Sequence, residues 1–394
     1  MLAFLPLLIV VLASLVAAQQ QQWALVPGTT ASTLVGCGAG SSTEAIGAAG
    51  VSGKGAFVDL FNGNAWSENG GILTAGLPMD GAISADGKLS FITSMFSMFV
   101  STDSSATYNA VPGIGGPMQG AYMFNGNSLA AVGPVLTLPG SGLKPGSVSG
   151  VAVSTDGQGQ TWTAYQVLDE TMCRYGAFPT ADTWYVTAGM WGNTTSSAAY
   201  HLKSVSGHSH RLSHRVQIGE AKAHAKVHGA VASTNGWYGN IYKTTNAGQS
   251  FTQVFASPNG SEYYFNLISC GDANTCIAAA EGQNTDGSNY GWIFATTDGG
   301  ATWTESWSGP ADSCMAVKMT SATEGFFAVG VKAGRNTGGN FYYTSDAGNT
   351  WTMTQNLVGC MPMDLDHAGG LGVATCINGS GTSMQLAMTT TTSK

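Results

Sequence analysis

Histidines gather in one short segment of the sequence and are its densest set of chemically versatile side chains. Six of the seven histidines fall within residues 201–228, among five basic residues and a single glutamate. Imidazole binds zinc and copper, but a closed zinc site needs about four converging ligands, and no Cys or Asp here completes a known spacing. We therefore expect no metal site, and we favour a contact for an anionic partner that strengthens in acid. The histidines are His201, His208, His210, His214, His224 and His228.

Carboxylates offer a second candidate chemistry, because glycoside hydrolysis needs two carboxyl groups roughly 5 to 10 Å apart. Asp364 and Asp366 are separated by one residue in an expected strand. We expect them to point to opposite faces or to lie along the same strand edge. The sequence therefore provides carboxylates but does not itself predict a facing catalytic pair.

The composition suits a large globular protein built from short strands. Of the 394 residues, 9% are charged, 43% are hydrophobic and 55 are glycine. This hydrophobic content argues against disorder, and glycine without a three-residue period excludes collagen. The net charge of −8 argues against a nucleic-acid partner, which requires a basic face. Short strands joined by glycine turns fit these figures better than charged amphipathic helices do.

The N-terminus is typical of a secreted protein. An uncharged apolar run over residues 2–16 is followed by Ala17 and Ala18. This pattern predicts a signal peptide over residues 1–18, cleaved after Ala18. The run is shorter than the roughly 20 residues of a membrane span, and no second run of that length follows, so we expect a soluble extracellular protein. Sequons at Asn193, Asn259 and Asn378 agree with a secreted glycoprotein.

A turn-forming motif, Ser/Thr-x-Asp-x-Gly-x-Thr-Trp, repeats along the chain and organises it. It is best preserved from Thr296 to Trp303 and from Thr344 to Trp351. The Asp or Asn side chain can accept backbone N–H groups, the glycine permits a positive φ, and the aromatic residue packs into the core. Each copy therefore predicts a hairpin turn after a strand. The structural positions of the motif are Asp103, Asp156, Trp162, Asn246, Phe251, Asp298, Trp303, Asp346 and Trp351.

These copies resemble the Asp-box, or bacterial neuraminidase, repeat. The family includes sialidases, sortilin-type receptors, Asp-box xyloglucanases and photosystem II assembly-factor-like proteins, all of which are β-propellers. The resemblance implies an all-β fold, with a single closed propeller of four-stranded antiparallel blades over residues 19–394. The motif would join the two outer strands of a blade. Residues 23–26 would supply the outer strand of the final blade and close the ring, which removes an exposed sheet edge.

The number of blades depends on the segment between Asp156 and Asn246, because this interval is nearly twice the usual spacing of the motif. Residues 214–251 align without gaps to residues 314–351, with an inner strand at 216–218 and a second strand at 227–231. We therefore predict eight blades. If residues 201–232 are an insertion instead, the count is seven.

The starts of the inner strands ring one mouth of a propeller channel and suggest a binding site there. We expect these starts at Met79, Met118, Cys173, Phe265, Cys314 and Cys360. Long loops after the second strands should flank the same mouth, and polar groups that converge on a cavity are the usual starting hypothesis for a site. The predicted ligand-binding residues are Asp80, Gln119, Arg174, Arg215, Asn266, Trp191, Tyr290 and Arg335.

Seven cysteines in a secreted chain imply disulfides and one cysteine left over. Cys270 and Cys276 flank a short turn, which predicts a bridge that closes a hairpin. Cys37 and Cys376 could pair across the ring closure. Catalysis by a cysteine lacks support, because the repeat places no histidine partner beside one.

Together these features predict a secreted, monomeric, non-catalytic propeller without a cofactor, which binds an extracellular glycan or protein ligand at its channel mouth. Sialidase chemistry needs three arginines on the substrate carboxylate, whereas this chain has four arginines in all and none in an Arg-Ile-Pro motif. The alternative is a divergent glycoside hydrolase of the sialidase or xyloglucanase type. A convergent carboxylate pair at the channel mouth, one of them with a raised pKa, would favour the hydrolase and count against the binding protein.

Overall fold

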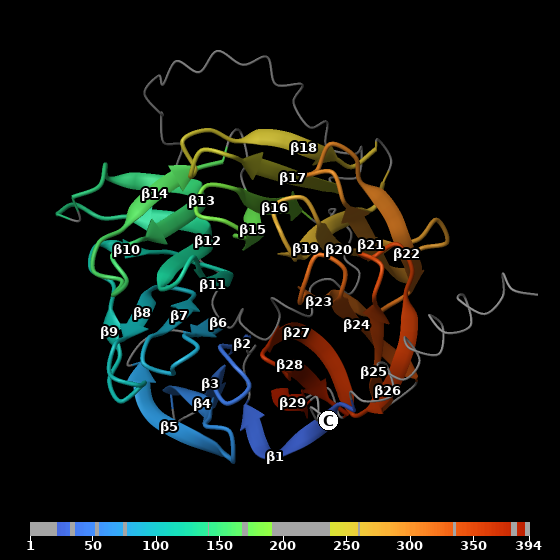
Figure 1. Ribbon diagram of the computed structural model, residues 1–394, viewed down its shortest axis with the longest axis horizontal. Helices are drawn as coiled ribbons and strands as arrows, with labels where there is room; N and C mark the ends of the chain where they lie inside the picture. The colour runs from blue at the N-terminus through green and yellow to red at the C-terminus, as the bar shows by residue number, and fades with distance from the viewer. Residues whose placement is uncertain are drawn as a thin grey trace, which may run out of the picture.

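The computed structural model places seven antiparallel sheets around a central axis, like the blades of a propeller (Figure 1). It describes residues 22–31, 36–51, 55–73, 77–140, 142–167, 172–190, 237–258, 261–333, 336–379 and 384–390. Every helix or strand found in these residues is a strand. The predicted signal peptide and the six histidines of residues 201–228 lie outside the described residues.

Each blade is an antiparallel sheet whose first strand lies nearest the axis. Blade 1 is β2 (Cys37–Ala39), β3 (Ala45–Val51), β4 (Gly55–Phe61) and β5 (Trp66–Leu73). Blade 2 is β6 (Pro78–Ile83), β7 (Ser90–Ser94), β8 (Met98–Ser101) and β9 (Asn109–Ala110). Blade 3 is β11 (Gly120–Phe124), β12 (Ser128–Thr137), β13 (Gly146–Ser154) and β14 (Thr163–Gln166), with β10 (Ile114–Gly115) also paired to β12.

The remaining blades follow the same order. Blade 4 is β15 (Cys173–Ala177), β16 (Trp184–Met190), β17 (Tyr238–Thr244) and β18 (Thr252–Ala256). Blade 5 is β19 (Tyr263–Cys270), β20 (Cys276–Gln283), β21 (Asn289–Thr296) and β22 (Thr304–Pro310). Blade 6 is β23 (Ser313–Met319), β24 (Gly325–Ala333), β25 (Asn336–Thr344) and β26 (Thr352–Val358). Blade 7 is β27 (Cys360–Ala368), β28 (Leu371–Asn378), β29 (Met384–Thr390) and β1 (Ala24–Ala31).

The count of eight blades predicted from the sequence is wrong, and the alternative of seven is correct. β16 pairs directly with β17, from Trp184 opposite Thr244 to Met190 opposite Tyr238. The long interval therefore separates the second and third strands of a single blade, and it does not contain a further blade between two copies of the turn. The strands predicted at 216–218 and 227–231 lie outside the described residues.

The N- and C-terminal strands close the ring within blade 7, as predicted. β1 pairs with β29, with Ala24 opposite Met388 and Leu25 opposite Ala387. Just before β1, Trp23 is only 2% exposed, and its ring stacks on Phe341 of blade 6 at a centroid distance of 4.7 Å. The closing strand is thus anchored to two blades.

The hydrophobic core lies between neighbouring blades. In β20, Ile277 through Ala280 are fully buried on both faces of the sheet. Because each face of a blade packs on the next blade, such strands are continuous apolar runs and do not alternate with polar residues. The second strands of the other blades are largely buried as well.

The repeated motif forms the turn between the third and fourth strands of blades 2 to 6. In blade 5, Asp298 Oδ1 accepts hydrogen bonds from the Thr302 N–H and the Thr296 hydroxyl, each at 2.9 Å. Its Oδ2 accepts one from the Thr302 hydroxyl at 2.6 Å. Hydrogen bonds from Thr302 and Thr296 lower the pKa of Asp298 to about 2. The motif is therefore a structural turn in this chain.

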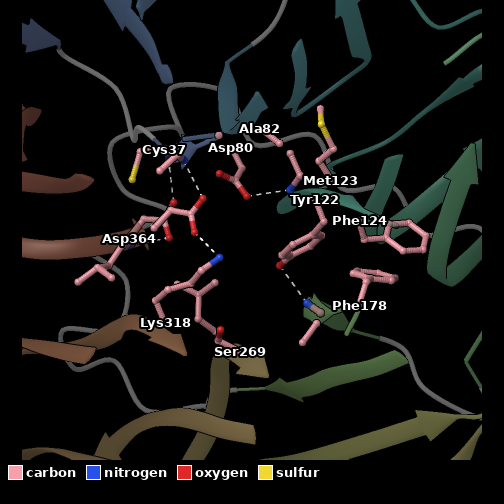
Figure 2. Close-up of a pocket in the computed structure, with 18 of the residues that line it drawn as sticks. Cys37, Asp80, Ala82, Tyr122, Met123, Phe124, Phe178, Ser269, Lys318 and Asp364 are labelled. Atoms are coloured by element: carbon pink, nitrogen blue, oxygen red, sulfur yellow. Dashed lines mark hydrogen bonds and ion pairs between the residues drawn. The ribbon is translucent and has the colours of Figure 1, made fainter. Parts of the chain in front are cut away.

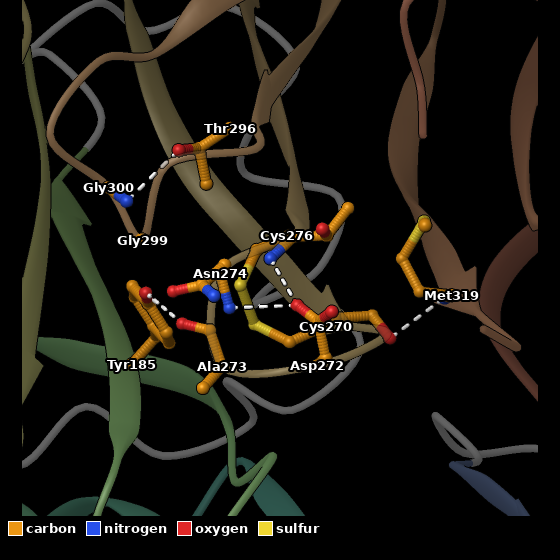
Figure 3. Close-up of a disulfide and its surroundings, with 12 residues drawn as sticks. Tyr185, Cys270, Asp272, Ala273, Asn274, Cys276, Thr296, Gly299, Gly300 and Met319 are labelled. Carbon is orange, nitrogen blue, oxygen red and sulfur yellow. Dashed lines mark hydrogen bonds between the residues drawn. A yellow bond between two sulfur atoms is a disulfide. The ribbon is translucent and has the colours of Figure 1, made fainter. Parts of the chain in front are cut away.

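Two disulfides form within the described residues. Cys270–Cys276 closes the β19–β20 hairpin, as predicted (Figure 3). Cys376, however, pairs with Cys360 and not with Cys37. Cys360 and Cys376 lie on neighbouring strands of blade 7, whereas Cys37 belongs to blade 1 and its thiol donates to the Val373 carbonyl oxygen.

Candidate functional site

A cavity of about 350 Å³ occupies the channel, and segments of the inner strands of all seven blades line it (Figure 2). Most of the lining residues belong to the second half of these strands or to the turns after them, such as Ser84 and Ala85 after β6. The cavity is therefore nearest the mouth at which the inner strands end. The binding site predicted from the sequence was at the opposite mouth, where the inner strands begin.

Two carboxylates enter the cavity from β27. Asp364 Oδ2 accepts a hydrogen bond from the Cys37 N–H at 2.9 Å, and Asp366 Oδ2 accepts one from the Ala39 N–H at 2.8 Å. Both donors belong to β2, so the two aspartates lie along the same strand edge, which is one of the two arrangements expected from the sequence. Lys318 of β23 adds a cation, with its Nζ 2.5 Å from Asp366 Oδ1.

A third carboxylate comes from β6. Asp80 is 6% exposed, and its Oδ2 accepts a hydrogen bond from the Ala121 N–H of blade 3 at 2.7 Å. Its other oxygen accepts the Gly81 N–H at 2.7 Å. Asp80 and Asp364 both line this cavity. Carboxyl groups from blades 2 and 7 therefore meet in the cavity.

Burial and neighbouring charges raise the pKa of both carboxyl groups. Burial raises the pKa of Asp364 to about 6, and the Asp366 charge adds to that rise. Burial also raises the pKa of Asp80 well above its usual value, with the Asp364 charge as the next cause. Desolvation opposes the charge of Lys318, but the neighbouring Asp366 and Asp364 carboxylates raise its pKa overall.

Aromatic side chains form another part of the cavity wall. Figure 2 shows Tyr122, Phe124 and Phe178 on the side away from Asp364 and Lys318. The Phe178 ring packs on Tyr122 and Phe124 at centroid distances of 5.2 and 5.1 Å. The Tyr122 hydroxyl accepts the Gly176 N–H of blade 4 at 2.9 Å. The cavity thus combines charged groups on one side with ring faces on another.

The predicted ligand-binding residues separate into different places. Asp80 lines the cavity. Arg174 and Asn266 are buried and bond to each other, with Arg174 Nη2 2.8 Å from Asn266 Oδ1. Gln119 is half-buried just before β11, and Tyr290 packs on Trp292 in the third strand of blade 5 at 5.1 Å. Trp191, Arg215 and Arg335 lie outside the described residues.

Sequence reasoning did not select Lys318, Tyr122, Asp364 or Asp366 as site residues. A usable signal was present in the last two, because residues two apart in a strand share one face. No comparable signal marks Lys318, because its ion pair with Asp366 joins two different blades.

Among the described residues, no group of three or more His, Cys, Asp or Glu side chains is arranged to hold a metal ion. In the same part of the chain, no helix is long and apolar enough to cross a membrane.

Solved structures resemble this chain in fold, although no family model and no curated protein matches it. A structure of YCF48 bound to a D1 peptide has a TM-score of 0.54 at 10% identity, over 95% of this chain and 97% of that chain. An ancestral GH74 enzyme has a TM-score of 0.51 at 12% identity, over 92% of this chain and 47% of that chain. An ulvan lyase of family PL25 has a TM-score of 0.50 at 9% identity, over 93% of this chain and 95% of that chain. At such identities the likeness concerns the fold alone: this chain is a seven-bladed β-propeller.

Proposed function

We propose that this chain is a secreted, non-catalytic propeller of the Asp-box type that binds a carbohydrate or protein ligand in its channel. The observation that carries the proposal is the cavity of about 350 Å³, to which the inner strands of all seven blades contribute. Small-molecule sites are commonly concave, a few hundred Å³ in volume, and lined by apolar groups with a few placed polar groups. A rigid ring of blades is a suitable scaffold for such a site.

The lining favours a carbohydrate over a protein segment. Asp366 and Lys318 offer charged hydrogen-bonding groups to hydroxyls, while Phe178 lies on the aromatic side of the cavity. Hydroxyl groups both donate and accept hydrogen bonds, so they match a site with a carboxylate and an ammonium side by side. The volume suits one or two sugar units, such as the end of a glycan.

The glycoside hydrolase remains a second candidate, because the channel contains a carboxyl pair with a raised pKa, the feature that favours it. One point argues against it. Both oxygens of Asp80 and both oxygens of Asp364 accept main-chain N–H groups. This pattern is more typical of a structural link between blades.

A glycan array with the secreted protein tests the proposal, and mass spectrometry of the bound glycans distinguishes binding from cleavage. Ala85 is exposed and lines the cavity, so Ala85→Trp should block the opening without changing the core. We expect at least a tenfold loss of affinity in this variant. Ala301, exposed on a turn of blade 5, provides the matched control Ala301→Trp. Equal binding by wild type and Ala85→Trp would contradict a channel site, and shortened glycans would support the hydrolase.

A further inference from the structure

The charged side chains that line the channel cavity are mainly acidic. Among the described residues, the wall contains the carboxyl groups of Asp80, Asp364 and Asp366 and a single cation, Lys318. That cation is already engaged, because its Nζ lies 2.5 Å from Asp366 Oδ1. A ligand that enters the cavity therefore meets more acidic groups than basic ones.

The entrance to the cavity has the same sign of charge. The turns between the first and second strands of the blades surround this mouth, and all their residues are described. They contain five acidic side chains and one lysine, and that lysine, Lys88, pairs with Asp86 at 3.3 Å. A cleft lined by one sign of charge concentrates ions of the opposite sign, so this mouth should attract cations. The acidic residues are Glu44, Asp86, Asp182, Asp272 and Glu324.

The main chain orients the cavity carboxyl groups and leaves them acceptor sites for a ligand. Asp364 Oδ1 accepts the Leu365 N–H at 2.8 Å, and its Oδ2 accepts the Cys37 N–H at 2.9 Å. Asp80 likewise accepts two main-chain N–H groups, one on each oxygen. An ionised carboxylate has about four acceptor sites, so these bonds use about half of them. The remaining sites suit an ammonium group, which has three donors.

We propose that the channel selects an amino sugar, whose ammonium group lies against the Asp364 and Asp366 carboxylates while its ring faces Phe178. This inference rests on the proposed carbohydrate function and narrows it to sugars with a free amine. Figure 2 shows Asp364 and Phe178 on different sides of the same cavity, so the two ends of a sugar unit meet different chemistry. A neutral sugar lacks the charge and a uronic acid has the opposite charge, so both should bind less tightly.

Protons should compete with the ammonium group for the cavity carboxylates. Burial raises the pKa of Asp364 to about 6, and it raises the pKa of Asp80 well above its usual value. An ammonium beside them favours their ionised forms, so its binding lowers these pKa values and releases protons. Affinity for the amino sugar should therefore rise as Asp364 ionises, by up to about tenfold per pH unit for one proton. Loss of the ligand's own proton, near the pKa of about 7.7–8.0 of an α-amino group, ends the rise.

The other titratable groups around these carboxyls keep their charge state near neutral pH. Desolvation opposes the charge of Lys318, but the Asp366 carboxylate raises its pKa overall, so it stays protonated. Burial lowers the pKa of His367, which follows Asp366 on the same strand, and keeps its ring neutral. Burial also raises the pKa of the thiol and the two hydroxyls that face the aspartates from other strands, which are those of Cys37, Tyr122 and Tyr175. The expected rise of affinity with pH is therefore assigned to the aspartates.

Calorimetric titration of the full chain between about pH 5 and pH 7 tests the inference with three disaccharides. They are β-1,4-linked glucosamine, cellobiose, which has a hydroxyl in place of the amine, and a glucuronate disaccharide. At about pH 7 we expect the glucosamine disaccharide to bind about tenfold more tightly than cellobiose, as one additional charged hydrogen bond should give, and the glucuronate to bind least tightly. Asp366→Asn removes a negative charge and should lower the ratio of the first two affinities toward one. Lys318→Gln removes the opposing charge and should raise that ratio, in which general damage to the cavity cancels.

Asp286 provides the matched control, because it is exposed on the turn after β20, at the opposite end of the blade from the cavity mouth. Asp286→Asn removes the same charge from the protein and should leave the affinity ratio unchanged. Cellobiose binding that Ala85→Trp blocks, with no preference for the amine and no rise with pH, would overturn the inference and leave the channel site intact. Glucuronate bound as tightly as glucosamine would also overturn it. Absence of all glycan binding on the array would overturn the proposed function and this inference together.

Discussion

Polar side chains of the inner strands bond to the main chain of the next blade, and these links hold the channel wall together. The Ser269 hydroxyl accepts the Met319 N–H at 2.9 Å, and the Ser313 hydroxyl donates to the Pro362 carbonyl oxygen at 2.9 Å. Inner strands of adjacent blades are not paired as strands, so their main-chain groups depend on such partners. Asp80 and Asp364 belong to the same system, because each accepts a main-chain N–H of the following blade.

The tryptophans of the repeated turn differ in burial, so replacing them should lower the free energy of unfolding by different amounts. Trp162 is 9% exposed, packs on Phe91 of blade 2 at 5.4 Å and donates from Nε1 to the Gly159 carbonyl oxygen. Trp162→Ala should lower the free energy of unfolding by about 3–5 kcal/mol, as a large core truncation does. Trp303 is half-buried, so Trp303→Ala should cost less. Urea unfolding of both variants measures their free energies of unfolding. Equal losses of stability in the two variants would contradict this prediction.

At this scale the local turns are easier to read from the sequence than the site. The turn at Asp298 is an example, because its hydrogen bonds span only four residues. Asp80 and Asp364 are far apart in the chain, and the ring brings both of them to one cavity. A local sequence pattern does not specify such a long-range arrangement.

Among elements, three of the repeated turns contain a site of avoidable strain, at Ser104, Ala247 and Ala347. The residue after the central Asp or Asn adopts a positive φ, which glycine provides in blade 5 as Gly299, with φ of 72°. In blade 6 the same position is Ala347, with φ of 63°. A left-handed conformation costs an L-residue about 1–2 kcal/mol, while glycine loses about 0.4–1 kcal/mol through its freer unfolded state. Ala347→Gly should therefore stabilise the protein, by about 0.5–1 kcal/mol.

Ala301 is the matched control for this substitution. It lies in the equivalent turn of blade 5, is exposed, and is not among the described residues with a positive φ. Ala301→Gly should destabilise the protein by about 0.4–1 kcal/mol. No strain is relieved there, so the only effect is the greater conformational freedom of glycine in the unfolded chain. Thermal or urea unfolding of both variants gives the sign of each change. A destabilising Ala347→Gly would show that the alanine is not strained.

Individual strands were predictable, but the blade count was not. The run Ile277–Ala280, for example, forms part of β20. Such runs are continuous apolar segments, which identify buried strands directly. The count failed because spacing cannot distinguish an added blade from a long connection within one. The pairing of β16 with β17 decides between them, and it is a contact between distant residues.

For the whole molecule, the scarcity of charge follows from the architecture. Only 9% of residues are charged, and the core clusters extend between every pair of neighbouring blades. A ring of radial sheets buries both faces of each blade, and the part of the chain that the structure describes contains no helix that could expose Lys and Glu. Stability therefore depends on completing the ring, because a missing strand uncovers an edge and two blade faces at once.

Removal of residues 22–31 tests the closing strand. β1 supplies the outer strand of blade 7, and Trp23 is bound by Gln355, which accepts its N–H at 2.7 Å and donates to its carbonyl oxygen at 2.9 Å. The truncated chain should unfold at lower temperature and self-associate through the exposed edge of β29, because unpaired strand edges template pairing with another chain. Light scattering after size-exclusion chromatography measures the association. Trp23→Ala, which keeps the strand but removes its buried ring, should lose about 3–5 kcal/mol without associating. A monomeric truncated chain as stable as the wild type would show that the ring does not require this strand.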